Sequence, residues 1–93
     1  MKRVRFSSAW EAIEPTAGEA ANMKLRADLM LHLRDLILEW ELTQAKAAKR
    51  LDITQPRLND LLRGRIDKFS LDSLVDLCGK AKLTVQLKIR EAA

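Results

Sequence analysis

The chain has 93 residues, 17 of them basic and 13 acidic, and a net charge of +4 at pH 7. This length allows one small domain with a modest core. Glycine and proline are scarce, and two Trp and two Phe are the only aromatic residues. Such a composition favours an all-α domain over a β-sandwich or barrel. The single cysteine excludes an internal disulfide, and no signal peptide or membrane-length apolar run is present, so we expect a cytoplasmic protein without membrane contact.

An N-terminal arm, residues 1–18, is predicted to precede the domain. Its first seven residues alternate charged and apolar side chains, which indicates a short strand or a loose basic arm. A short helix over 8–14 would place Trp10 and Ile13 on one face, and a linker over 15–18 would follow. Because two helical turns are not stable alone in water, the arm must pack on its own domain, fold on a partner or stay mobile.

The predicted domain, residues 19–93, begins with the longest helical pattern, from Glu19 to about Trp40. At 100° per residue its apolar side chains fall within a stripe of roughly 120°. This stripe predicts a core-facing side made of Leu25, Leu29, Leu33, Leu36, Ile37 and Trp40. A later helix, capped by Ser70, is predicted to reach about Ala81, with Cys78 buried rather than reactive.

Two short helices joined by a tight turn are predicted between Thr43 and Gly64. Thr43 and Thr54 can cap them, and Pro56 falls in the first turn of the second helix, where its missing N–H does no harm. The predicted inner faces are Ala47, Ala48 and Leu51, then Leu58, Leu61 and Leu62. A helix-turn-helix has this pattern, because the first helix must carry small residues where the second crosses it.

The excess positive charge lies in the same stretch. Between Thr43 and Lys68, seven basic residues stand against three acidic ones, and the rest of the chain has ten of each sign. A local basic excess is the electrostatic footprint of a phosphate-binding face. The alternative is that this is an ordinary solvated helix surface.

The run TQAKAAKRLDITQPRLNDLLRGRIDKFSLDSLVDL resembles the xenobiotic-response-element (XRE) family of helix-turn-helix regulators, which includes lambda repressor and Cro-like domains. The resemblance covers residues 20–89 and is close within the branch with AANMKLRADLM before the motif and FSLDSLV after it. That branch includes antitoxins of host-inhibition-of-growth toxin–antitoxin pairs. The resemblance implies a lambda-repressor-like bundle of about five helices that contacts DNA through Gln44 and Gln55. Asp52 stands where the family often has glycine, but aspartate tolerates left-handed backbone.

Two groups of residues are predicted to contact double-stranded DNA. Exposed side chains at the start of the second helix would read bases, because glutamine can pair with adenine and arginine with guanine: Thr54, Gln55, Arg57 and Asn59. Other side chains would contact phosphates and position the protein on the duplex: Gln44, Lys46, Arg63, Arg65 and Lys68. The alternative is that all of them only cap and solvate helices.

The C-terminal segment Thr84–Arg90 alternates polar and apolar residues, which predicts a β-strand with Val85, Leu87 and Ile89 facing inward. A lone strand leaves its backbone groups unpaired, so this one must pair with Lys2–Phe6 or with its copy in a second chain. We favour the second chain and hence a homodimer, because repressors of this type read paired half-sites.

The leading hypothesis is a dimeric repressor that is also the antitoxin of a type II toxin–antitoxin pair. It would repress its own operon and neutralise a ribonuclease toxin. In the antitoxin branch an element outside the DNA-binding domain binds the toxin, which assigns that role to Trp10 and Ile13. The alternatives are a stand-alone XRE-type repressor and a protein-interaction module, against which the basic excess argues. We expect no enzyme, cofactor or metal site, because the sequence lacks the residue groupings that these need.

Overall fold

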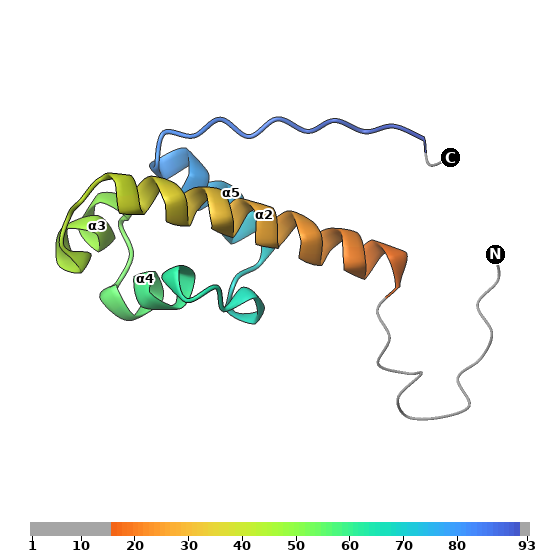
Figure 1. Ribbon diagram of the computed structural model, residues 1–93. Helices are drawn as coiled ribbons and strands as arrows, with labels where there is room; N and C mark the ends of the chain where they lie inside the picture. The colour runs from red at the N-terminus through yellow and green to blue at the C-terminus, as the bar shows by residue number, and fades with distance from the viewer. Residues whose placement is uncertain (1–15, 92–93) are drawn as a thin grey trace, which may run out of the picture.

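The computed structural model describes residues 16–91, which form a bundle of helices (Figure 1). Its elements are α2 (Ala17–Glu39), α3 (Gln44–Leu51), α4 (Gln55–Leu62), the 3-10 turn η1 (Ile66–Lys68) and α5 (Leu71–Lys80). The long helix α2 packs against α5, α4 and η1, and the short helix α3 packs against α4 and α5. Within this range, none of the helices combines the length and hydropathy that crossing a membrane requires.

A side-chain hydroxyl caps the N-terminus of each of these four α-helices. In every case the oxygen accepts a hydrogen bond of 3.1–3.2 Å from the amide three residues later; the caps are Thr16, Thr43, Thr54 and Ser70. Thr16 N also donates to Glu19 Oε1 at 3.2 Å, which completes a capping box. The last three caps confirm the sequence prediction. The linker predicted over 15–18 is wrong from Ala17 on, because the capping box starts α2 there.

The core lies where α2 crosses the shorter helices. Its buried side chains come from all four α-helices and from the residues that follow η1 and α5: Met30, Leu33, Ile37, Ala47, Ala48, Leu51, Leu58, Leu61, Phe69, Leu74, Leu77, Cys78 and Ala81. Leu33 and Ile37 confirm the predicted stripe on α2, whereas Leu25 is 43% exposed and Met30 is buried instead. Leu25 is exposed because the first turns of α2 extend past the rest of the bundle (Figure 1).

Cys78 is buried in this core, as predicted. Burial raises the pKa of its thiol, because the charged thiolate would lose its hydration. The side chain therefore packs as a small apolar group.

The turn between α3 and α4 depends on a residue in left-handed backbone. Asp52 has φ 57° and ψ 46°, and its N–H donates to Lys49 O at 3.0 Å. The next amide, Ile53 N, donates to Ala48 O at 3.0 Å, so the chain reverses within two residues of the end of α3. The sequence predicted that Asp52 would tolerate left-handed backbone at this turn, where the XRE family often has glycine, and its dihedral angles confirm this.

We expect Asp52→Gly to change the free energy of unfolding by less than about 0.5 kcal/mol, because glycine adopts φ > 0 freely but gains entropy when unfolded. Asp52→Val should lower it by about 1–2 kcal/mol, because a β-branched residue clashes in this conformation. Urea denaturation followed by circular dichroism measures both. Asp52→Asn is the control: it removes the exposed 3.9 Å pair with Lys80 and should behave like the parent.

The predicted C-terminal strand is absent from the described part of the chain, which contains no strand at all. Residues 84–91 run as an extended segment away from the end of α5 (Figure 1). Val85, Leu87 and Ile89 are exposed rather than inward, the last two by 75% and 82%. Alternation predicts extended backbone correctly, but a strand also needs a neighbouring backbone to pair with.

The described residues contain four α-helices, so the predicted bundle of about five helices is not confirmed. The short helix predicted over 8–14 lies outside the described residues, as do Trp10, Ile13 and the Lys2–Phe6 segment. The domain boundary predicted at residue 18 falls inside α2.

Candidate nucleic-acid interface

Helices α3 and α4 cross closely because α3 presents alanines at the crossing. Ala47 and Ala48 are buried, and so are Leu58 and Leu61 of α4, as the sequence predicted. The crossing leaves a shallow hollow of about 510 Å³ on the surface, lined by residues of both helices and of the turn: Ala45, Ala48, Lys49, Asp52, Ile53, Thr54 and Gln55. A cation and an amide, Lys49 and Gln55, thus lie at one exposed concave surface.

The N-terminus of α4 is the exposed end of the predicted reading helix. Thr54 and Gln55 are exposed, and Asn59 is half-buried. Thr54 Oγ1 accepts from Arg57 N at 3.2 Å, which leaves the hydroxyl hydrogen free to donate. Within residues 16–91 the Gln55 side chain makes no hydrogen bond, so both its donor and its acceptor remain available to a base edge.

Arg57 is placed differently from the other predicted base readers. Its Nη1 donates to Lys68 O at 2.6 Å, and its guanidinium carbon lies 4.0 Å from the centre of the Phe69 ring. Phe69 is buried, with 2% of its surface exposed. Arg57 therefore contacts the segment before α5 instead of projecting freely from α4.

The predicted phosphate contacts are all exposed, but they differ in their partners. Gln44 is the first residue of α3 and lines a pocket with Leu58 and Leu62, so it lies beside α4. Arg65 is 3.7 Å from Asp60, a carboxylate that partly offsets its charge. Lys46, Arg63 and Lys68 form no ion pair with any described residue. Among the predicted phosphate contacts, Gln44 is thus the one that the structure places beside α4.

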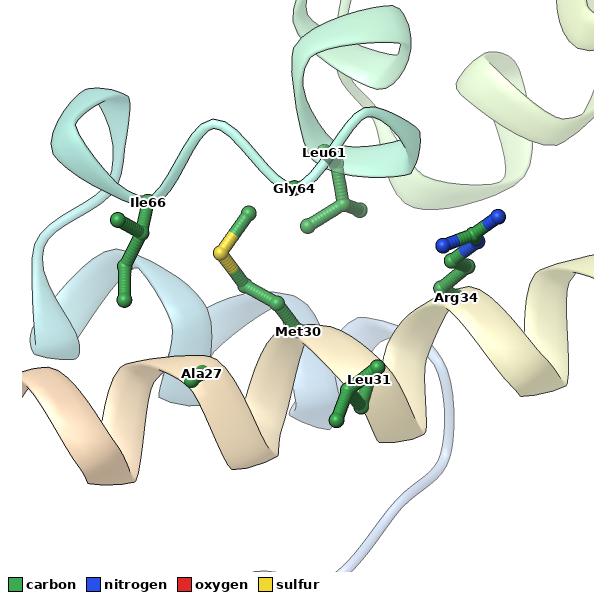
Figure 2. A pocket seen from close by; sticks show the side chains of 7 residues that line it. All are labelled: Ala27, Met30, Leu31, Arg34, Leu61, Gly64 and Ile66. Atoms are coloured by element: carbon green, nitrogen blue, oxygen red, sulfur yellow. The ribbon is translucent and has the colours of Figure 1, made fainter.

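A separate, apolar pocket of about 350 Å³ opens between α2 and the segment after α4 (Figure 2). Met30 points from α2 toward Gly64, and Ile66 closes one end. Arg34 is the only charged residue of its lining: Ala27, Met30, Leu31, Arg34, Leu61, Gly64 and Ile66. This pocket does not have the polar character that phosphate or base recognition needs.

The sequence did not reveal one arginine that contacts the segment before α5. Arg26, on α2, donates from Nη1 to Ile66 O at 3.1 Å and to Phe69 O at 3.2 Å. Its Nε is buried and has no hydrogen-bond partner among residues 16–91. Its partners are about 40 positions away in the sequence, so no local pattern marks it.

Comparison with known families agrees with this geometry. A family model described as a helix-turn-helix domain matches residues 13–90, most of the chain. The chain belongs to this helix-turn-helix family. No curated protein matches the sequence. Membership in the helix-turn-helix family indicates a DNA-binding regulator, whereas the XRE and antitoxin resemblances stay predictions.

Proposed function

We propose that this helix-turn-helix protein is a cytoplasmic, sequence-specific repressor that binds a double-stranded operator through α3 and α4. The observation that carries the proposal is the exposed start of α4, where Gln55 is free to bond, within the segment Thr43–Lys68, whose seven basic and three acidic residues give it a net charge of +4. The first helix lies across the phosphates and the second enters the major groove in this motif. Such a role needs no catalytic group or cofactor.

Base reading is assigned first to Gln55, with Thr54 and Asn59 in support. Gln55→Ala should weaken binding to the preferred duplex by about 1–3 kcal/mol and relax its sequence preference, because one bidentate base contact is lost. The duplex is first selected by the parent protein from a random library, and affinities are measured by fluorescence anisotropy. Equal preference in parent and variant would remove Gln55 from the reading set.

Phosphate contact is assigned to Gln44, Lys46, Arg63, Arg65 and Lys68. Lys68→Ala should weaken selected and scrambled duplexes alike, and reduce the slope of log affinity against log salt by about 1, because one counterion fewer is released. The same anisotropy titrations, repeated at several salt concentrations, measure the slope. Lys24→Ala removes the same charge from an exposed position on α2 and serves as control. An unchanged slope in Lys68→Ala contradicts this contact.

We further propose that the protein acts as a homodimer joined through the extended segment 84–90. Alternate side chains of this segment, Val85, Leu87 and Ile89, form an exposed apolar row. A second copy of the segment would cover this row and pair with its backbone. Two motifs would then read half-sites about one helical turn (~34 Å) apart.

The finer proposal is the antitoxin role in a type II pair, which would repress its own operon and neutralise a ribonuclease toxin. Its support is the resemblance of the stretches before and after the motif, together with the arm that carries Trp10 and Ile13. Co-expression with the product of the adjacent open reading frame tests it: a small ribonuclease-like protein should co-purify with the parent and not with Trp10→Ala/Ile13→Ala. A neighbour that never co-purifies favours the stand-alone repressor.

A further inference from the structure

The segment that joins α4 to α5, residues 63–70, carries three of the predicted phosphate contacts. Packing holds it against the bundle only in part: Ile66 is partly buried against the core, and an apolar pocket of about 350 Å³ opens between α2 and Gly64 (Figure 2). Its buried anchor, Phe69, comes only after the last of these contacts, Lys68. The placement of the charged side chains therefore depends on contacts to the backbone of this segment.

Two arginines from different helices supply these contacts. Arg26 of α2 binds the carbonyls of Ile66 and Phe69. Arg57 of α4 binds the carbonyl of Lys68, at 2.6 Å, and stacks on the Phe69 ring at 4.0 Å. A hydrogen bond from a charged donor is roughly twice as strong as a neutral one, and the aromatic ring adds a cation–π attraction. Arg57 is the only one of the two on the reading helix.

We propose that Arg57 is a positioning residue, which holds Lys68 beside the reading helix and does not itself read a base. Gln55 and Arg57 are two residues apart and so point about 200° apart around α4. To reach a base edge, the Arg57 side chain would have to break its hydrogen bond with the Lys68 carbonyl and leave the Phe69 ring. Gln55 has no such contact to lose. The inference rests on the proposed DNA binding.

A double-mutant cycle on the selected duplex tests the role. Arg57→Ala should weaken binding to selected and scrambled duplexes by about the same factor, near tenfold, and lower the salt slope. In the Lys68→Ala background, Arg57→Ala should weaken binding by only about twofold or less relative to Lys68→Ala alone, because the side chain that Arg57 positions is gone. The backbone carbonyl of residue 68 remains in Lys68→Ala, so that variant keeps the contacts of Arg57 with this carbonyl and with the Phe69 ring.

Two results of the cycle would overturn the proposal. A loss of sequence preference in Arg57→Ala as large as that in Gln55→Ala would make Arg57 a base reader. A full tenfold effect of Arg57→Ala in the Lys68→Ala background would make it an independent phosphate contact. Lys24→Ala, on the exposed part of α2, controls for the loss of one positive charge.

A measurement without DNA separates this proposal from the proposed function. Lys68 N donates to Arg65 O and Phe69 N to Ile66 O, so hydrogen exchange of these two amides reports on the segment. Exchange should be about tenfold faster in Arg57→Ala than in the parent and intermediate in Arg57→Lys, which keeps one donor but loses the stacked plane. Unchanged exchange in both variants overturns positioning. A parent that binds no duplex overturns DNA binding but leaves the exchange result interpretable.

Discussion

Phe69→Ala is expected to lower the free energy of unfolding by about 3–5 kcal/mol, one of the largest effects of any single substitution in this protein. Phe69 is among the largest fully buried side chains, and its ring also supports the Arg57 guanidinium. A small domain has only about 5–15 kcal/mol in total, so the variant should be close to unfolding at room temperature. Urea denaturation monitored by circular dichroism gives the difference in midpoint and slope.

Phe69→Leu is the matched control, because it keeps an apolar side chain of similar volume but removes the aromatic face. It should lower the free energy of unfolding by about 1–1.5 kcal/mol. Leu31→Ala, at a side chain that is 56% exposed on α2, should change it by less than about 0.5 kcal/mol. If Phe69→Ala proves no less stable than Phe69→Leu, the segment before α5 is not anchored by this ring.

Leu87→Lys/Ile89→Lys is expected to convert the proposed homodimer to monomer and to weaken binding to a duplex with two half-sites by about a hundredfold or more. Lysines along an extended edge oppose pairing, and two linked motifs gain about 10²–10⁴ over one. Light scattering at micromolar concentration gives the mass, and anisotropy the affinity. The added positive charge favours DNA electrostatically, so a loss cannot come from repulsion.

Met23→Lys is the control for this pair, because Met23 is 47% exposed and lies in the first turns of α2, outside the predicted DNA contacts. It should leave both mass and affinity unchanged, and a duplex with one half-site should bind parent and double variant alike. A monomeric parent, with its tail intact, contradicts dimerisation through residues 84–90.

Local sequence signals predicted most of the motif. Thr43 and Thr54 cap helices because their hydroxyl oxygens accept amide N–H groups that have no partner within the first helical turn. Asp52 turns the chain because aspartate tolerates φ > 0. The capping box of Thr16 and Glu19 was equally visible, but the neighbouring proline and glycine suggested a linker instead.

Features that depend on distant partners were not predictable in this way. Helical periodicity marks Leu25 and Leu33 alike, but it does not show where α2 extends beyond its neighbours. The position of Arg57 early in a reading helix predicts a base contact, but it does not reveal the contacts with Lys68 and Phe69, which lie more than ten residues later. The alternation of polar and apolar residues over 84–90 predicts extended backbone. It does not show which second segment, if any, this backbone pairs with.

The most direct test of the central claim is a titration of ¹⁵N-labelled protein with the selected duplex, followed by amide chemical shifts. DNA binding through α3 and α4 predicts that the largest changes fall at Gln44–Lys46, Thr54–Asn59 and Arg63–Lys68. The exposed first turns of α2 should be unaffected. Largest changes along α2 or α5, or no change at saturating duplex, would contradict the account.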